Sequence, residues 1–277
     1  MAQVIDSHHH FWKYSPQEYS WIGEGQSVLK RNFLPADLKN EVDAAGVNGV
    51  LSVQARQSLE ETRWLLELAE KNDFIRGVVG WAPLVSKDVE KDLEKVAAQK
   101  KLKGIRHVLQ DEKDDRYAVR EDFRRGIGVL KKFGLVYDIL IYEKQLPAAI
   151  ELVDKFPKQV FVLDHAAKAK IREKVISPWR ERMKELAKRE NVYCKLSGMA
   201  TEADHGGWEP ADLRPYVDVA MEAFGPKRLM FGSDWPVCLL AVTYQRWVGV
   251  VRDFIAKLSA SEQERVMGGT ALEAYKL

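Results

Sequence analysis

Residues 4–12, with the sequence VIDSHHHFW, begin with a short apolar run that ends in polar residues. Seven further apolar runs of similar length, rich in β-branched residues, follow along the chain. The eight runs cover residues 4–6, 49–54, 75–81, 103–107, 135–139, 160–164, 192–196 and 229–232. Runs of this length and composition are typical of the buried strands of a parallel sheet.

Amphipathic segments separate these runs, with apolar residues spaced as on one face of a helix. Strand–helix units that recur roughly every 25–45 residues predict a parallel sheet, and eight such strands usually close into a barrel. We therefore predict an α/β fold, a single (β/α)8 TIM barrel, in one domain over residues 1–277. The alternative is an open doubly wound sheet. It is disfavoured because no glycine-rich nucleotide loop follows the first run.

The composition favours small-molecule chemistry. Hydrophobic residues make up 46% and charged residues 30% of the chain, and the formal net charge is +2. A charge so close to neutral argues against nucleic acid or an anionic membrane as partner. The beginning of the chain lacks the pattern of a signal peptide, and no apolar stretch approaches the roughly 20 residues of a membrane helix. We expect a cytoplasmic protein, with Cys194 and Cys238 as reduced thiols.

A long aromatic segment, residues 11–35, follows the first run. It carries the aromatic residues Phe11, Trp12, Tyr14, Tyr19, Trp21 and Phe33. A connection of this length in a barrel predicts a wall or lid over the mouth. The alternative is that the segment simply packs on the barrel rim.

Polar residues gather where the predicted strands end, which in a barrel is the face that carries the active site. His8 and His10 belong to a D-x-H-x-H pattern, and alternation along a strand points both side chains the same way, where they can share a divalent metal. Asp234 follows the last run and neighbours the first strand once the barrel closes, so it can hold and deprotonate a water. His165 follows the sixth run and can bind metal or polarise a carbonyl. The alternatives are core histidines for the imidazoles and a helix cap for Asp234.

These motifs resemble the amidohydrolase superfamily: D-x-H-x-H after the first strand, a histidine after the sixth, and G-S-D-W-P at residues 232–236. More narrowly, VIDSHHHFW (4–12), KGIRH (103–107), KLSGM (195–199), TEAD (201–204) and FGSDWP (231–236) resemble its sugar-lactonase branch, which includes L-fuconolactonase and L-rhamnonolactonase. The resemblance covers nearly the whole chain and is more specific to the family than to the substrate.

The resemblance implies a lactonase that opens a sugar lactone, an aldonolactone such as L-fucono- or L-rhamnonolactone, to its hydroxy acid. Asp234 would be the general base, His8 and His10 with His165 would hold a metal, and Arg106 would face the substrate carbonyl or a ring hydroxyl. The residues expected to contact the sugar are Gln54, Trp81, His107, Lys195, His205 and Trp235. For each tryptophan the alternative is packing on the rim, and for Lys195 it is a simple strand-end charge.

Dinuclear members of the superfamily use a bridging lysine or glutamate after strand four and a histidine after strand five. Here Arg106 and His107 end the fourth run, and no histidine follows the fifth. We therefore expect one divalent metal ion, preferably zinc, or none.

Three other functions compete with the lactonase. A metal-dependent decarboxylase of a small aromatic acid belongs to the same superfamily, but KGIRH and TEAD favour the lactonase. A metal-dependent nuclease would need two metals on a phosphate, against which Arg106 and the near-zero charge argue. A non-catalytic binding barrel is disfavoured because reactive residue types fill the expected polar positions. Oligomeric state is not predicted.

Overall fold

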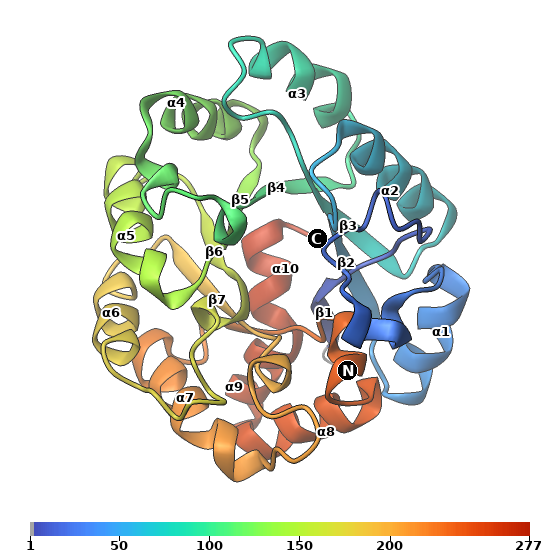
Figure 1. Cartoon of the computed structure of the whole chain (residues 1–277), viewed down its shortest axis with the longest axis vertical. Helices are drawn as coiled ribbons and strands as arrows, with labels where there is room; N and C mark the ends of the chain where they lie inside the picture. The colour runs from blue at the N-terminus through green and yellow to red at the C-terminus, as the bar shows by residue number, and fades with distance from the viewer. Residues whose placement is uncertain (1–2) are drawn as a thin grey trace.

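The chain folds around a barrel of parallel strands with helices on its outside (Figure 1). The computed structural model describes residues 3–277. Within them the strands of the sheet are arranged in sequence order from β1 to β8, and every neighbouring pair is parallel. The strands are β1 (Ile5–His9), β2 (Gly49–Val53), β3 (Ile75–Gly80), β4 (Leu102–Val108), β5 (Val136–Leu140), β6 (Phe161–Leu163), β7 (Val192–Leu196) and β8 (Leu229–Phe231). The predicted TIM barrel is confirmed, and the open sheet is ruled out.

The last strand returns to the first and brings two distant stretches of sequence together. A parallel bridge joins His9 and Trp235. The amide of His10 donates to the carbonyl of Trp235, and the amide of Asp234 donates to the carbonyl of His8, both at 2.7 Å. These bonds fix Asp234, in the loop after β8, beside the histidines at the end of β1.

Helices cover the outside of the barrel and bury apolar faces against it. They are α1 (Pro35–Ala44), α2 (Leu59–Lys71), α3 (Val89–Ala97), α4 (Glu121–Leu130), α5 (Leu146–Lys155), α6 (Trp179–Leu186), α7 (Pro210–Phe224), α8 (Tyr244–Ile255) and α9 (Ala260–Glu264). The last helix, α10 (Thr270–Tyr275), lies at one end of the barrel instead. The start of α2 shows the local chemistry: the Ser58 side chain accepts hydrogen bonds from the amides of Glu60 and Glu61, which would otherwise lack partners. No helix within residues 3–277 combines the length and apolar character that crossing a membrane requires.

The C-terminal helix α10 closes one end of the barrel. Figure 1 shows it at the centre of the ring of strands. Its Ala271, Ala274 and Tyr275 belong to the apolar core of the barrel interior, together with residues such as Ile5 and Met230. This end is filled with side chains, so the polar strand ends at the opposite end remain for chemistry.

The aromatic segment after β1 both packs on the rim and forms a wall. Trp12, Tyr19 and Phe33 are buried, and backbone hydrogen bonds of 2.9 and 3.0 Å pair Trp12 with Phe33. Trp21, in contrast, is 41% exposed and lines a cavity at the barrel mouth. The two alternatives drawn from the sequence therefore apply to different residues of the same segment.

Both cysteines, Cys194 and Cys238, are buried free thiols, as the sequence predicts. Burial raises the pKa of each thiol above its usual value. Neither sulfur is therefore a ready nucleophile, and the chemistry must come from other side chains.

Candidate active site

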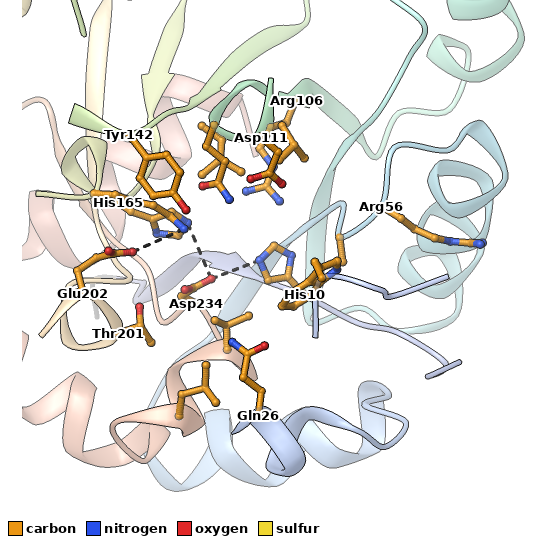
Figure 2. Close-up of a pocket in the computed structure, with 18 of the residues that line it drawn as sticks. His10, Gln26, Arg56, Arg106, Asp111, Tyr142, His165, Thr201, Glu202 and Asp234 are labelled. Carbon is orange, nitrogen blue, oxygen red and sulfur yellow. Dashed lines mark ion pairs between the residues drawn. The ribbon is translucent and has the colours of Figure 1, made fainter. Parts of the chain in front are cut away.

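Three histidines from two strand ends surround one carboxylate at the open end of the barrel. Figure 2 shows two of them, His10 and His165, on either side of Asp234. Asp234 Oδ1 lies 3.3 Å from His10 Nε2, 3.7 Å from His8 Nε2 and 3.9 Å from His165 Nε2. The two β1 imidazoles are themselves 3.2 Å apart through their Nε2 atoms. The structure thus brings together the four residues proposed for the centre from the sequence.

A hydrogen bond on the far side of the His10 ring decides where its proton lies. His10 Nδ1 is 2.8 Å from the carbonyl of Val53, which can only accept, so this nitrogen carries a proton. His8 Nδ1 lies between an acceptor and a donor, 3.3 Å from a carboxylate oxygen of Asp164 and 3.3 Å from Lys195 Nζ. In its neutral form the His10 ring therefore presents an Nε2 lone pair toward Asp234.

Burial favours the neutral form of His8 and of His165, whereas Asp234 stays ionised. Desolvation lowers the pKa of His8 well below its usual value and lowers the pKa of His165 to about 4. Burial also opposes ionisation of Asp234, but the surrounding imidazoles, led by His165, hold the pKa of its carboxyl below the usual range. The site therefore holds a carboxylate base at neutral pH.

The same donors fit a divalent metal ion. Two sets of side chains place one ligand atom each within 4.8 Å of one another: His8, His10 and Asp234, and His8, Asp164 and His165. Tetrahedral zinc with bonds of about 2.0–2.1 Å needs ligand atoms about 3.3 Å apart, close to the distances around Asp234. The hydrogen bond of His10 to the Val53 carbonyl and the Asp164 carboxylate beside His8 are also the kinds of partner that orient metal-binding imidazoles.

Arg106 on β4 adds a cation to this cluster. Its Nη1 donates to Asp164 Oδ2 at 3.0 Å and lies 3.3 Å from His8 Nε2. Its Nη2 donates to the backbone carbonyl of Gln54 and, at 3.2 Å, to the Gln54 side-chain oxygen. Arg106 lines the cavity, and both of its Nη atoms are held by Asp164, His8 and Gln54.

A second, fully buried network lies beneath the imidazoles. Lys195 Nζ is 2.5 Å from Asp138 Oδ2, 3.0 Å from Asp164 Oδ1 and 3.3 Å from His8 Nδ1. The hydroxyl of Tyr275, from α10, donates to Asp138 at 2.8 Å. Lys195 is fully buried and does not line the cavity, so it supports His8 from below rather than facing a ligand.

The loop after β8 is held by a carboxylate that the sequence reading did not single out. Asp6 accepts hydrogen bonds from the Ser233 amide (2.8 Å) and hydroxyl (2.6 Å) and from the Tyr244 hydroxyl (3.1 Å). Burial raises the pKa of Asp6 to about 6. As the first residue of D-x-H-x-H, Asp6 links the β1 motif to the loop that carries Asp234.

His165 reaches the centre through an unusual turn. Residues 165–168 all have positive φ, with His165 at 53°, a conformation that costs energy for non-glycine residues. Gly198, after β7, makes room for the ring: a Cβ at this position would lie 2.6 Å from His165 Nδ1. The Ser197 hydroxyl contacts the same nitrogen at 2.9 Å. The loop after β7 thus positions His165.

The site opens into a cavity of about 570 Å³. Of the residues proposed from the sequence, His10, Arg106, His165, Asp234 and His205 line it. His8 lies directly beneath, behind His10 and Asp234. The cavity therefore contains a base, a cation and imidazoles within one space large enough for a small molecule.

The other residues proposed for sugar contact lie outside the cavity lining. Gln54 is buried behind Arg106, and Trp81 is half-buried. His107 stacks on Tyr117 at 5.3 Å, because neighbouring residues of a strand point to opposite sides and Arg106 takes the inner one. Trp235 is buried in the aromatic cluster, with its ring edge-on to Phe33 at 5.2 Å.

Comparison with known proteins agrees with this geometry. The sequence profile described as amidohydrolase matches residues 5–277. The chain belongs to the amidohydrolase family. L-fucono-1,5-lactonase of Burkholderia multivorans is 43% identical over the whole chain and 97% of that protein, and L-fucono-1,5-lactonase of Burkholderia ambifaria is 36% identical with the same coverage. The crystal structure of a Burkholderia multivorans amidohydrolase with bound zinc is 42% identical, covers both chains fully, and superposes with a TM-score of 0.95.

For this amidohydrolase, most of the cavity wall comes from loop residues that were not proposed individually as site residues, although Trp21 lies in the aromatic segment predicted to form a wall and Glu202 lies in TEAD. They include Trp21, Gln26, Arg56, Gln57, Gln110, Asp111, Tyr142, Lys168 and Glu202. Each lies one or more residues beyond a strand end or in the aromatic segment. Figure 2 shows Glu202 and Arg56 on opposite sides of Asp234. A search of the loops beyond each strand, not only of the last strand residues, would have included them.

Proposed function

We propose that this protein, as one domain over residues 1–277, hydrolyses an aldonolactone such as L-fucono- or L-rhamnonolactone to the open-chain hydroxy acid. The observation that carries the proposal is the Asp234 carboxylate at the floor of the cavity, surrounded by His8, His10 and His165. The lactonase class is further supported by the two full-length relatives named L-fucono-1,5-lactonase.

The chemistry requires a base and a polarised carbonyl. Asp234 takes a proton from water, and the water oxygen bonds to the lactone carbonyl carbon. Arg106 lies on the cavity side of this cluster and donates to the oxygen that gains negative charge. The bond from the carbonyl carbon to the ring oxygen then breaks, and protonated Asp234 returns its proton to the departing alkoxide. The product is one carboxylic acid with a free hydroxyl, which loses its acid proton to solvent.

His8, His10, His165 and Asp234 are the residues that would hold a divalent ion in this protein. Such an ion would lower the pKa of a bound water and would polarise the substrate carbonyl. Arg106 competes with it for the lone pair of His8 Nε2, from which Nη1 is 3.3 Å away. A second ion at the strand ends is disfavoured, because Lys195 and Arg106 already neutralise Asp138 and Asp164.

We expect metal-depleted protein to bind one equivalent of zinc at most, measured by titration calorimetry with the metal alone. His10→Ala should weaken this binding by more than about 100-fold, since losing even an outer-shell partner costs about 10- to 100-fold. His205→Ala, which removes a cavity histidine outside the cluster, should leave zinc affinity unchanged. A second equivalent of similar affinity would contradict the single site.

A substrate panel tests the proposed function. We expect acid release, followed with a pH indicator and corrected with a protein-free blank, from one or more of L-fucono-, L-rhamnono-, L-galactono- and D-sugar lactones. Carboxylated phenols should release no carbon dioxide. Decarboxylation of an aromatic acid without lactone opening would establish the competing decarboxylase, and no turnover in either arm would indicate a non-catalytic barrel.

A further inference from the structure

One exposed aromatic side chain stands at the cavity mouth. Among residues 3–277, the large apolar side chains that remain exposed are Trp21, Val28, Val85 and Val175. Of these, only Trp21 lines the cavity, with 41% of its surface open to solvent. An exposed indole keeps apolar surface in contact with water in the free protein. A ligand with an apolar surface gains binding free energy by covering it.

The indole of Trp21 is fixed from behind by a buried neighbour. Its ring meets that of Trp12 edge-on, with centroids 5.7 Å apart and an interplanar angle of 89°. Trp12 is fully buried, and its Nε1 donates to the carbonyls of Arg31 (2.9 Å) and Leu29 (3.3 Å). In such a T-shaped pair Trp12 covers at most one face of the Trp21 ring, so at least one ring face is left for another contact.

A second anchor holds the same segment against the loop after β2. The Tyr19 hydroxyl donates to Glu61 Oε1 at 3.3 Å. Glu61 Oε2 in turn accepts the amides of Ala55 and Arg56, each at 2.9 Å. Arg56 closes the link with an ion pair to Glu18. Trp21 therefore belongs to a wall tied down at several points, which reduces the entropy lost when a ligand packs on it.

The remainder of the cavity lining offers mostly hydrogen-bonding groups. Gln110, Asp111, Lys168, Glu202 and His205 all face the same space. A ligand that matches this cavity has one apolar face for the indole and several hydroxyls for the other walls. A sugar ring has this character, because its C–H bonds form an apolar face while its hydroxyls project outward.

We propose that Trp21 is the platform on which the ring of the lactone stacks, and that it selects the closed ring over the open-chain product. The identity of the ligand rests on the proposed function, whereas the platform itself rests on the exposure and anchoring of the indole. Opening the lactone removes the flat ring face, so the product loses this contact and leaves more readily.

The test compares Trp21→Ala and Trp21→Phe with Val28→Ala, a control that trims an equally exposed side chain of the same segment outside the cavity. We expect Trp21→Ala to raise KM for the preferred aldonolactone about 5- to 10-fold, with kcat within about twofold, the size of one aromatic contact. Trp21→Phe should raise KM less, and Val28→Ala not at all. The inhibition constant of the hydroxy-acid product should change less than about twofold in Trp21→Ala.

An equal loss for lactone and product would show that Trp21 shapes the cavity without stacking on the ring, and an unchanged KM would remove it from the site. Binding of L-fucose, a pyranose without an ester, provides an arm that needs no turnover. Its effect on tryptophan fluorescence should be present in wild type and lost in Trp21→Phe. If wild type opens no lactone yet shows this binding, the proposed function fails and the platform stands.

Discussion

Replacing Asp234 by asparagine is expected to reduce kcat for lactone opening by about 10²- to 10⁴-fold, the usual contribution of a positioned base. The amide keeps one oxygen toward His10 but cannot take a proton from water. Asparagine is the matched substitution for a second reason: Asp234 has a φ of 59°, and asparagine tolerates this left-handed conformation better than most residues. The backbone carbonyl of Asp234 accepts a hydrogen bond from the Cys238 amide, and the backbone amide of Asp234 donates one to the His8 carbonyl. Neither bond involves the side chain that the substitution changes.

The fold should therefore survive Asp234→Asn, and a thermal unfolding curve close to that of wild type checks this. Steady-state kinetics on the preferred lactone then measures the loss in kcat. Turnover near the wild-type level in a folded variant would exclude Asp234 as the base and leave the imidazoles as candidates. A loss seen only in KM would instead assign Asp234 to binding.

The strands could be predicted because their signal is local. Each apolar run lies within a few residues of an observed strand, and closure of β8 onto β1 follows from the number of strands. The short helix α10 gave no such signal. Its six residues are held by contacts inside the barrel with strands far away in sequence, as in the packing of Ala271 and Ala274. The helix propensity of these six residues does not indicate where in the barrel the helix packs.

The centre of the site was predictable for a similar reason, and its periphery was not. His8 and His10 lie at the end of β1, and His165 and Asp234 lie in the first few residues after β6 and β8, so the barrel geometry brings them together. The same geometry also distinguishes adjacent residues of one strand. Because side chains alternate between the two faces, Arg106 and His107 cannot both point into the barrel. Loop residues such as Glu202 have no fixed alternation, and their directions depend on turns like the left-handed stretch at residues 165–168.

Lys195→Met is expected to lower the free energy of unfolding by about 3–5 kcal/mol, the usual cost of removing one partner from a buried ion pair. Lys195 is fully buried, and its ammonium faces Asp138, Asp164 and His8. Methionine fills much of the space but leaves Asp138 without a cation, with the Tyr275 hydroxyl as its remaining donor. Urea unfolding measures the effect. Lys144→Met, which breaks an exposed pair with Asp115, should change stability by less than about 1 kcal/mol.

The double variant Lys195→Met/Asp138→Asn separates lost charge balance from lost packing. Burial raises the pKa of Asp138 to about 6 even with Lys195 beside it, so this carboxylate is costly to keep ionised and should become more costly without the ammonium. An amide at residue 138 removes that charge while keeping an acceptor for Tyr275, and we expect it to recover more than half of the lost stability. Asp164 retains Arg106 at 3.0 Å and needs no such compensation. If Asp138→Asn instead adds to the damage, the ammonium acts chiefly by packing, and the charge network beneath His8 is not what holds that imidazole in place.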